Sequence, residues 1–290
     1  DVVLSVSSGD TGEATVSPAT LTFTSGNWDS AQTVTITGAN DSLIDGSQTT
    51  TITVSVVDES SNDSFDSLAD QTVSVSTADD DTAAFTVTQS DGSTSVDESG
   101  STDTFTVVLD AQPTSDVVLS VSSGDTGEAT VSSATLTFTS GNWDSAQTVT
   151  IAGVDDDAVD GDQGTTTTLS VVDESSDDSF DSLNDQTVTV STADNDTASF
   201  TVTQSGGSTS VAESGTTDTF TVVLGAQPTS DVTLSVTSGD TGEATVSTET
   251  LQFTSGNWNS AQTVTVTGVN DSLIDGSQNT TITMSVVDAS

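Results

Sequence analysis

The chain has 290 residues, of which 45 are Asp or Glu, and it contains no Lys, Arg, His or Cys, so its formal net charge is −45. The missing residue types exclude Ser-His-Asp and Cys-His nucleophiles, ordinary zinc sites, disulfides and the lysine of a P-loop. So dense a negative charge should repel nucleic acid and anionic membranes, and it favours hard cations with oxygen ligands as partners.

One long unit recurs along the chain. DVVLSVSSGDTGEATVS begins at Asp1 and again at Asp116, and a near copy begins at Asp231, each step being 115 residues. This period exceeds the roughly 20–50 residues of solenoid repeats and matches a whole domain. Acidic joints precede two strand-like runs, AAFTVTQS and ASFTVTQS. We therefore predict a partial domain at 1–81, a complete domain at 82–196 and a partial domain at 197–290.

Within residues 82–196, apolar residues alternate with Thr and Ser at period two, which is typical of half-buried strands. Apolar stripes with helical spacing are absent. In chain order, seven predicted strands (A to G) are centred on 85–87, 105–109, 117–121, 136–138, 149–151, 169–171 and 188–190. This pattern predicts an all-β chain of tandem immunoglobulin-like, seven-stranded antiparallel β-sandwich domains.

Carboxylates gather in the loops at one end of this predicted sandwich. The A–B, C–D and E–F loops should share an end with the residues that follow strand G. That end carries Glu98, Asp125, Asp155, Asp156, Asp157, Asp160, Asp194 and Asp196. Without a counterion these groups would repel strongly, and a divalent cation would relieve the repulsion. The F–G loop at the other end is also acidic, and it should face the preceding domain.

Short motifs in these segments resemble a known family. SVDESG (95–100), TFTVVL (104–109), ATLTF (134–138), TVTIAGVDDD (148–157) and the closing acidic run are similar to Calx-beta repeats, which occur in sodium–calcium exchangers and large bacterial surface proteins. The tandem form resembles giant bacterial adhesins and extracellular filament proteins. The resemblance implies Ca²⁺ held by a Glu early in the domain, an Asp after the third strand, an acidic pair after the fifth strand and the closing acidic run.

Matching residues occur in all three copies. In the second copy they are Glu98, Asp125, Asp155, Asp156, Asp194 and Asp196. The first copy supplies Asp10, Asp41, Asp79, Asp80 and Asp81, and the third supplies Glu213, Asp240 and Asp271. Besides these matches, we expect Asp157, Asp160, Asp45 and Asp275 to be ligands. Asp160-Gly161-Asp162 replaces the Glu-rich continuation usual in the family, and Asn40 or Asn270 replaces the first acid of the pair in the other copies. These replacements lower the ligand charge there.

We expect a structural role rather than an enzyme. Asp-Thr-Gly, the aspartic-protease signature, occurs once per unit, whereas that chemistry needs two such carboxylates at one site. The expected function is a calcium-stiffened extracellular or cell-surface stalk or filament for adhesion or a biofilm matrix. Its partners would be neighbouring repeats of the same long chain, with other copies in a fibre as an extension. Three alternatives stay open: carboxylates that only solvate the surface, a module that binds polysaccharide or a receptor, and a fibre subunit joined by strand exchange.

Overall fold

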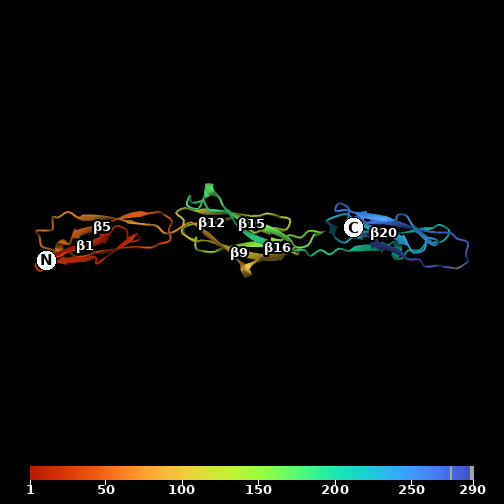
Figure 1. Ribbon diagram of the computed structural model, residues 1–290, viewed down its shortest axis with the longest axis horizontal. Coiled ribbons are helices and arrows are strands. Elements are labelled where there is room, and N and C mark those ends of the chain that lie inside the picture. The colour runs from red at the N-terminus through yellow and green to blue at the C-terminus, as the bar shows by residue number, and fades with distance from the viewer. Residues whose placement is uncertain (275, 288–290) are drawn as a thin grey trace.

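The computed structural model describes residues 1–274 and 276–287. Strands and short 3₁₀ turns make up its regular structure, and the described residues include no α-helix. Three β units lie end to end along the long axis of the molecule, with the N-terminus at one extremity (Figure 1). No helix within the described part of the chain is long and apolar enough to cross a membrane.

The second unit contains two sheets, with strand orders β11-β13-β9-β7 and β12-β10-β15-β16-β8. Its elements are β7 (Phe85–Gln89), η2 (Ser90–Gly92), β8 (Thr94–Asp97), β9 (Thr102–Leu109), β10 (Val117–Ser123), β11 (Ala129–Val131), β12 (Thr135–Phe138), β13 (Gln147–Gly153), β14 (Ala158–Val159), β15 (Gln163–Val171), η3 (Asp173–Ser175) and β16 (Gln186–Ala193). These orders are those of an immunoglobulin-like sandwich, so the predicted fold class is confirmed.

The core of this unit follows from the period-two pattern. Along β9, Phe105, Val107 and Leu109 are buried, while the residues between them are more exposed. Phe105 lies opposite Val149 across the β9–β13 ladder, and both side chains are inaccessible to solvent. The facing sheet contributes buried residues such as Leu119 to the same cluster. Alternation therefore places one face of each sheet in the core and the other in water.

Predicted strand A corresponds to β7, and a further strand, β8, follows it in the other sheet. Strand β7 pairs antiparallel with β9, whereas β8 pairs parallel with β16 in the other sheet. The chain changes sheets at η2, where Asp91 and Gly92 have φ values of 52° and 81°, in the left-handed region that glycine adopts readily. Consequently the residue after β8, Glu98, lies beside the end of β16. Strands β8, β11 and β14 are additions to the seven predicted strands.

The other two units repeat this plan in part. The first comprises sheets β3-β1-β5-β6 and β2-β4, built from β1 (Val2–Ser8), β2 (Ala14–Ser17), β3 (Thr20–Phe23), β4 (Thr35–Gly38), β5 (Gln48–Val56), η1 (Asp58–Ser60) and β6 (Gln71–Thr77). The third comprises sheets β17-β18-β23-β21 and β22-β20-β24, built from β17 (Phe200–Gln204), η4 (Ser205–Gly207), β18 (Thr217–Leu224), β19 (Gln227–Pro228), β20 (Val232–Ser238), β21 (Ala244–Val246), β22 (Thr250–Phe253), β23 (Gln262–Gly268) and β24 (Ile282–Val286).

Candidate metal centre at the unit junction

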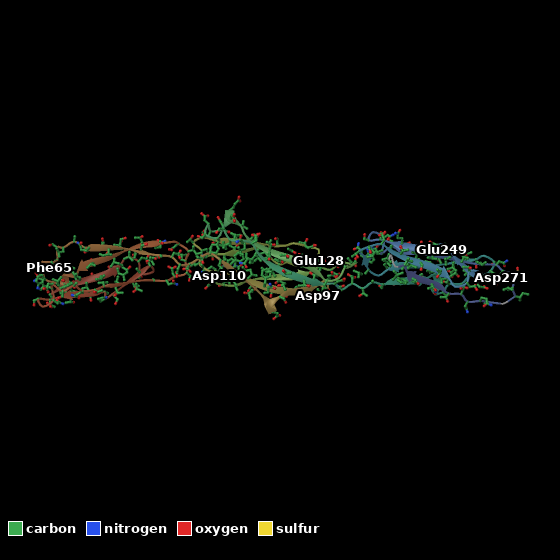
Figure 2. The ribbon with its side chains drawn as sticks, in the orientation of Figure 1. Phe65, Asp97, Asp110, Glu128, Glu249 and Asp271 are labelled. Carbon is green, nitrogen blue, oxygen red and sulfur yellow. The ribbon has the colours of Figure 1, made fainter. Side chains whose placement is uncertain are left out.

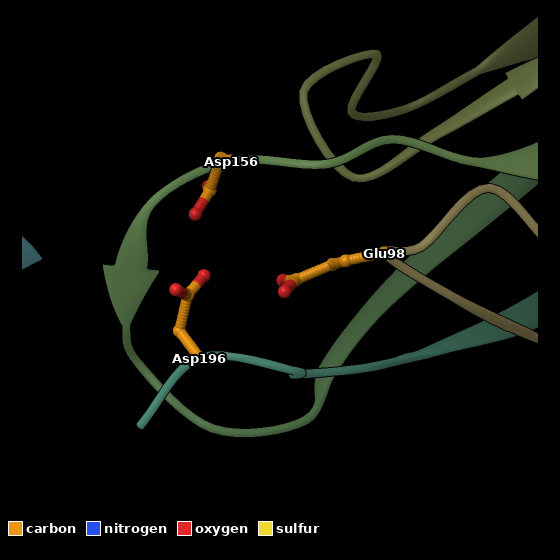
Figure 3. Close-up of side chains that lie close together, drawn as sticks. All are labelled: Glu98, Asp156 and Asp196. Carbon is orange, nitrogen blue, oxygen red and sulfur yellow. The ribbon is translucent and has the colours of Figure 1, made fainter. Parts of the chain in front are cut away.

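Three carboxylates from separate loops converge at one end of the second unit. One carboxylate oxygen from each of Glu98, Asp156 and Asp196 lies within 4.8 Å of the others. Figure 3 shows the three side chains pointing toward one another from the A–B loop, the E–F loop and the segment after β16. We call these residues the junction cluster. Glu98 is buried, Asp196 is half-buried and Asp156 is exposed, so the cluster opens to solvent on one side.

Strand pairing positions Glu98. Its backbone N–H donates to the carbonyl of Ala193 (3.2 Å), and its Oε2 accepts a hydrogen bond from the N–H of Asn195 (3.1 Å). The same turn passes very close to Gly153, where an added Cβ would lie 2.0 Å from the carbonyl oxygen of Asp97. Glycine at this position therefore allows the start of the E–F loop to approach the loop that carries Glu98.

Backbone hydrogen bonds fix the other two loops. Asp156 Oδ1 accepts from the N–H of Ala158 (2.6 Å), which holds the E–F loop in a turn. Asp194 accepts from the N–H groups of Asp196 (2.6 Å) and Gly161 (2.7 Å), so it joins the E–F loop to the segment after β16. The side-chain amide of Asn195 donates to Asp155 Oδ1 (3.1 Å). Two of the predicted ligands, Asp155 and Asp194, thus brace the loops around the cluster.

Burial and neighbouring negative charges raise the pKa values of two carboxyl groups in the junction cluster. Burial raises the pKa of Glu98, a hydrogen bond from Asn195 lowers it in part, and the charges of Asp194, Asp156 and Asp196 raise it further. Burial also raises the pKa of Asp196, and four neighbouring aspartates add to the effect. The folded protein therefore disfavours the ionised state of these groups. A bound cation would reverse that preference.

Glu128 is a member of this site that the sequence analysis missed. Burial raises its pKa, and so do the charges of Asp160, Asp156, Asp125 and Glu98. Its Oε2 atom is buried and has no hydrogen-bond partner. In Figure 2, Glu128 lies at the end of the second unit that faces the third unit. The signal in the sequence was the repeated Gly-Glu-Ala, which places a Glu at 13, 128 and 243.

The donors fit a hard divalent cation. All are carboxylate oxygens, the ligand type that Ca²⁺ prefers, and Ca²⁺ takes about 6–8 of them in flexible geometry. Asp196 Oδ2, like the orphaned oxygen of Glu128, is buried without a hydrogen-bond partner. Unpaired buried oxygens are costly, so their presence beside the cluster favours a cation that would satisfy them.

A related arrangement occurs at the end of the first unit. Glu13, Asp41, Asp45, Asp79, Asp80 and Asp81 line one small cavity. Burial raises the pKa of Asp81, and Asp79, Asp80 and Asp41 raise it further. Asp79 repeats the bracing role of Asp194, since it accepts from the N–H groups of Asp81 (2.8 Å) and Gly46 (2.8 Å), which hold its pKa below the ordinary value.

Several other predicted ligands accept hydrogen bonds within local backbone turns. Asp10, Asp125 and Asp240 each accept, through Oδ1, a hydrogen bond from the backbone N–H two residues later (2.8–2.9 Å). Asp271 forms the same kind of turn with Leu273 (2.8 Å). Glu213 belongs to no group of three close carboxylates within residues 1–274 and 276–287. Asp275 lies outside the described residues. Asp157 and Asp160 are exposed members of the E–F loop.

The acidic F–G loop has an internal structural contact. Asp177 is 4% exposed and accepts from the backbone N–H groups of Thr114 (2.8 Å) and Ser115 (2.9 Å) and from Ser179 N–H (3.0 Å). Burial alone would raise the pKa of Asp177, but these bonds and the Thr114 hydroxyl outweigh it and hold that pKa far below the ordinary value. This carboxylate therefore anchors the B–C loop of its own unit.

Comparisons with known proteins show only that the fold of this chain is similar to folds seen in solved structures. No family model matches the chain, and no curated protein matches it. Similar solved structures include domains 4 and 5 of the S-layer protein SbsC (17% identity, 66% of this chain and 70% of that chain, TM-score 0.30). The apo-form Calx CBD1 domain is 17% identical over 39% of this chain and 98% of that chain, with a TM-score of 0.27. CBD12 from CALX1.2 is 14% identical over 63% and 75%, with a TM-score of 0.27. Likeness at this level carries no argument about function.

Proposed function

We propose that the chain is a structural tandem-repeat segment of an extracellular or cell-surface protein, and that Ca²⁺ bound at the unit junctions stiffens it into a stalk or filament. Domain boundaries at 81/82 and 196/197 belong to this proposal. Its central support is the convergence of Glu98, Asp156 and Asp196 from three segments, one of which, the E–F loop, contacts the third unit through the hydrogen bond from Gln227 N–H to the carbonyl of Asp157.

The ion would hold together segments that otherwise repel. Glu98, Asp156 and Asp196 would be direct ligands, with Asp155 and Glu128 completing the oxygen shell. Asp41, Asp81 and Glu13 would serve at the first junction. Because the loops come from different parts of the unit, the metal would cross-link the A–B loop, the E–F loop and the segment leading to the next unit. Metal that binds only the folded form also stabilises it by mass action.

Small-angle X-ray scattering of the full chain tests this function. In EGTA, we expect scattering from an ensemble of bent and straight arrangements. In millimolar Ca²⁺ we expect a larger maximum dimension and a narrower ensemble, and Mg²⁺ should have a much weaker effect because it demands small octahedral sites. Superimposable curves in EGTA and Ca²⁺ would remove the stiffening role.

A further inference from the structure

The tip of each E–F loop offers a second type of contact between units. These tips are residues 42–44, 157–159 and 272–274, spaced by 115. At the first junction, Gln112 N–H donates to the carbonyl of Ser42 (2.6 Å), and Ile44 N–H donates to the carbonyl of Gln112 (3.1 Å). At the second junction, Gln227 N–H donates to the carbonyl of Asp157 (2.6 Å). The same register recurs, with β14 pairing parallel to β19.

The receiving surface is also repeated. Both B–C loops read Ala-Gln-Pro-Thr-Ser, at 111–115 and 226–230. In each, the glutamine side chain donates to a carbonyl of its own D–E turn, Gln112 to Ser140 and Gln227 to Ser255, both at 2.9 Å. That bond fixes the loop while the glutamine backbone faces the tip of the preceding unit. The side chain of each glutamine therefore holds the B–C loop against its own unit, while the backbone of the same residue contacts the tip.

Apolar side chains accompany the backbone contact. Ile44 is half-buried and packs against the hydrophobic core of the second unit, although it belongs to the first. Val159 holds the corresponding place at the second junction and lines an apolar cavity with Leu224, Ala226 and Pro228 of the third unit. Both tips thus bring an aliphatic side chain onto the B–C end of the next unit.

The third tip provides an internal comparison. Residues 270–278 repeat residues 40–48 letter for letter. Yet Leu273 is 68% exposed and Ile274 is fully exposed, whereas Leu43 and Ile44 are half-buried. The sequence of the tip is the same, so its burial at residue 44 comes from the neighbouring unit. Asp271, next to this tip, lies at the outer end of the third unit (Figure 2).

We propose that the E–F tip is an interdomain latch, whose partner is the Ala-Gln-Pro-Thr-Ser loop of a following repeat of the same type. The aliphatic residue supplies apolar burial, and the glutamine backbone fixes the register. This inference rests on the proposed end-to-end structural role, but it does not require metal. Ile44 and Val159 contact the following unit in this way, and Ile274 is the equivalent side chain of the third unit.

Distance measurements on the full chain test the latch. The chain has no Cys, so T22C and T137C, at equivalent exposed positions of the first two units, accept spin labels without background. Double electron–electron resonance in EGTA should give the labelled parent a distance distribution of limited width, which Ca²⁺ should narrow further under the proposed function. I44D should at least double its width, I44A should give an intermediate width, and I274D should leave it unchanged. Circular dichroism checks that every variant is folded.

Two results would overturn the latch: an I44D distribution as narrow as that of the parent, or an I274D distribution as broad as that of I44D. Adding Ca²⁺ to the same samples separates the two proposals. If I44D broadens the distribution in EGTA and Ca²⁺ has no effect on the parent, the latch stands and the calcium-stiffening function fails.

Discussion

Replacing Glu98 with Gln should stabilise the calcium-free second unit and remove most of the response of that unit to calcium. The oxygens of Glu98, Asp156 and Asp196 lie within 4.8 Å of one another, a distance at which two unit charges repel by about 1 kcal/mol in water and about 3.5 kcal/mol at an effective dielectric constant of about 20. Asp156 is exposed and Asp196 is half-buried, so solvent screening favours the lower figure. The amide oxygen of Gln can still accept the hydrogen bond from Asn195. We therefore expect E98Q to gain about 1–2 kcal/mol in EGTA.

The rise in melting temperature that calcium causes follows from the free energy of binding. At a concentration about 100 times the dissociation constant, a ligand adds about 2.7 kcal/mol to the free energy of unfolding. For a unit of about 115 residues, that corresponds to a rise of about 10 °C in melting temperature. Differential scanning calorimetry of the full chain should show this rise in the transition of the second unit for the wild type, and less than about a third of it for E98Q.

Glu213→Gln is the matched control, because Glu213 occupies the same position in the third unit but has no cluster of three carboxylates within the described residues. E213Q should leave both the calcium-free melting temperature and the calcium response of the second unit unchanged. The reasoning would be refuted if E98Q lowered the melting temperature in EGTA, or if it kept the full response to calcium.

Three further outcomes follow from the site. Folding raises the pKa values of Glu98, Glu128 and Asp196 above their ordinary values of 4.5 for Glu and 3.8 for Asp. Because the folded state then binds more protons than the unfolded state, the free energy of unfolding in EGTA should rise as the pH falls from about 7 toward those values, while calcium affinity should fall. Urea unfolding and calcium titration across this pH range check the two directions. D177A leaves buried donors unpaired and should lower the free energy of unfolding in urea by about 2–4 kcal/mol. D177N should lower it by less than half as much, because Asn62 fills the corresponding position of the first unit and accepts a hydrogen bond from Ser64 N–H (3.0 Å). Equal losses for the two variants would contradict the anchoring role. G153A forces a Cβ to within 2.0 Å of a backbone oxygen, so it should lower the free energy of unfolding by more than about 2 kcal/mol and weaken calcium binding. At the equivalent position of the first unit, the Cβ of G38A would meet only a methyl group at 3.6 Å, so G38A should change neither stability nor calcium binding.

The strands were predictable because their side chains alternate. Thr and Ser face water and Val, Leu, Ile and Phe face the core, as the burial of Phe105, Val107 and Leu109 shows. Loop sides then follow from strand order, which is why Glu98, Asp156 and Asp196 could be assigned to one end without coordinates. The additional strand β8, which joins the other sheet after η2, was not predicted, since the residues on both sides of η2 have the same alternating pattern.

The remaining features depend on contacts between distant segments. Asp125 stays a predicted ligand, and the sequence did not show that its Oδ1 also accepts a hydrogen bond from Gly127 N–H, a local contact typical of Asx turns. Glu128 was overlooked because a single Glu before a short strand is ordinary in sequence. The apolar Leu43 and Ile44, inside an acidic loop, were the one signal of a contact between units, and their exact repetition at 273–274 could have indicated it.

Isothermal titration of Ca²⁺ into the full, calcium-free chain tests the central claim most directly. The account predicts saturable binding with a dissociation constant in the range of extracellular calcium modules or tighter, about 1 mM or below, and loss of at least one site in E98Q but not in E213Q. Heats that show no saturation up to about 10 mM Ca²⁺, ten times that limit, would contradict the account, because the carboxylates at the junction would then be no more than a solvated surface.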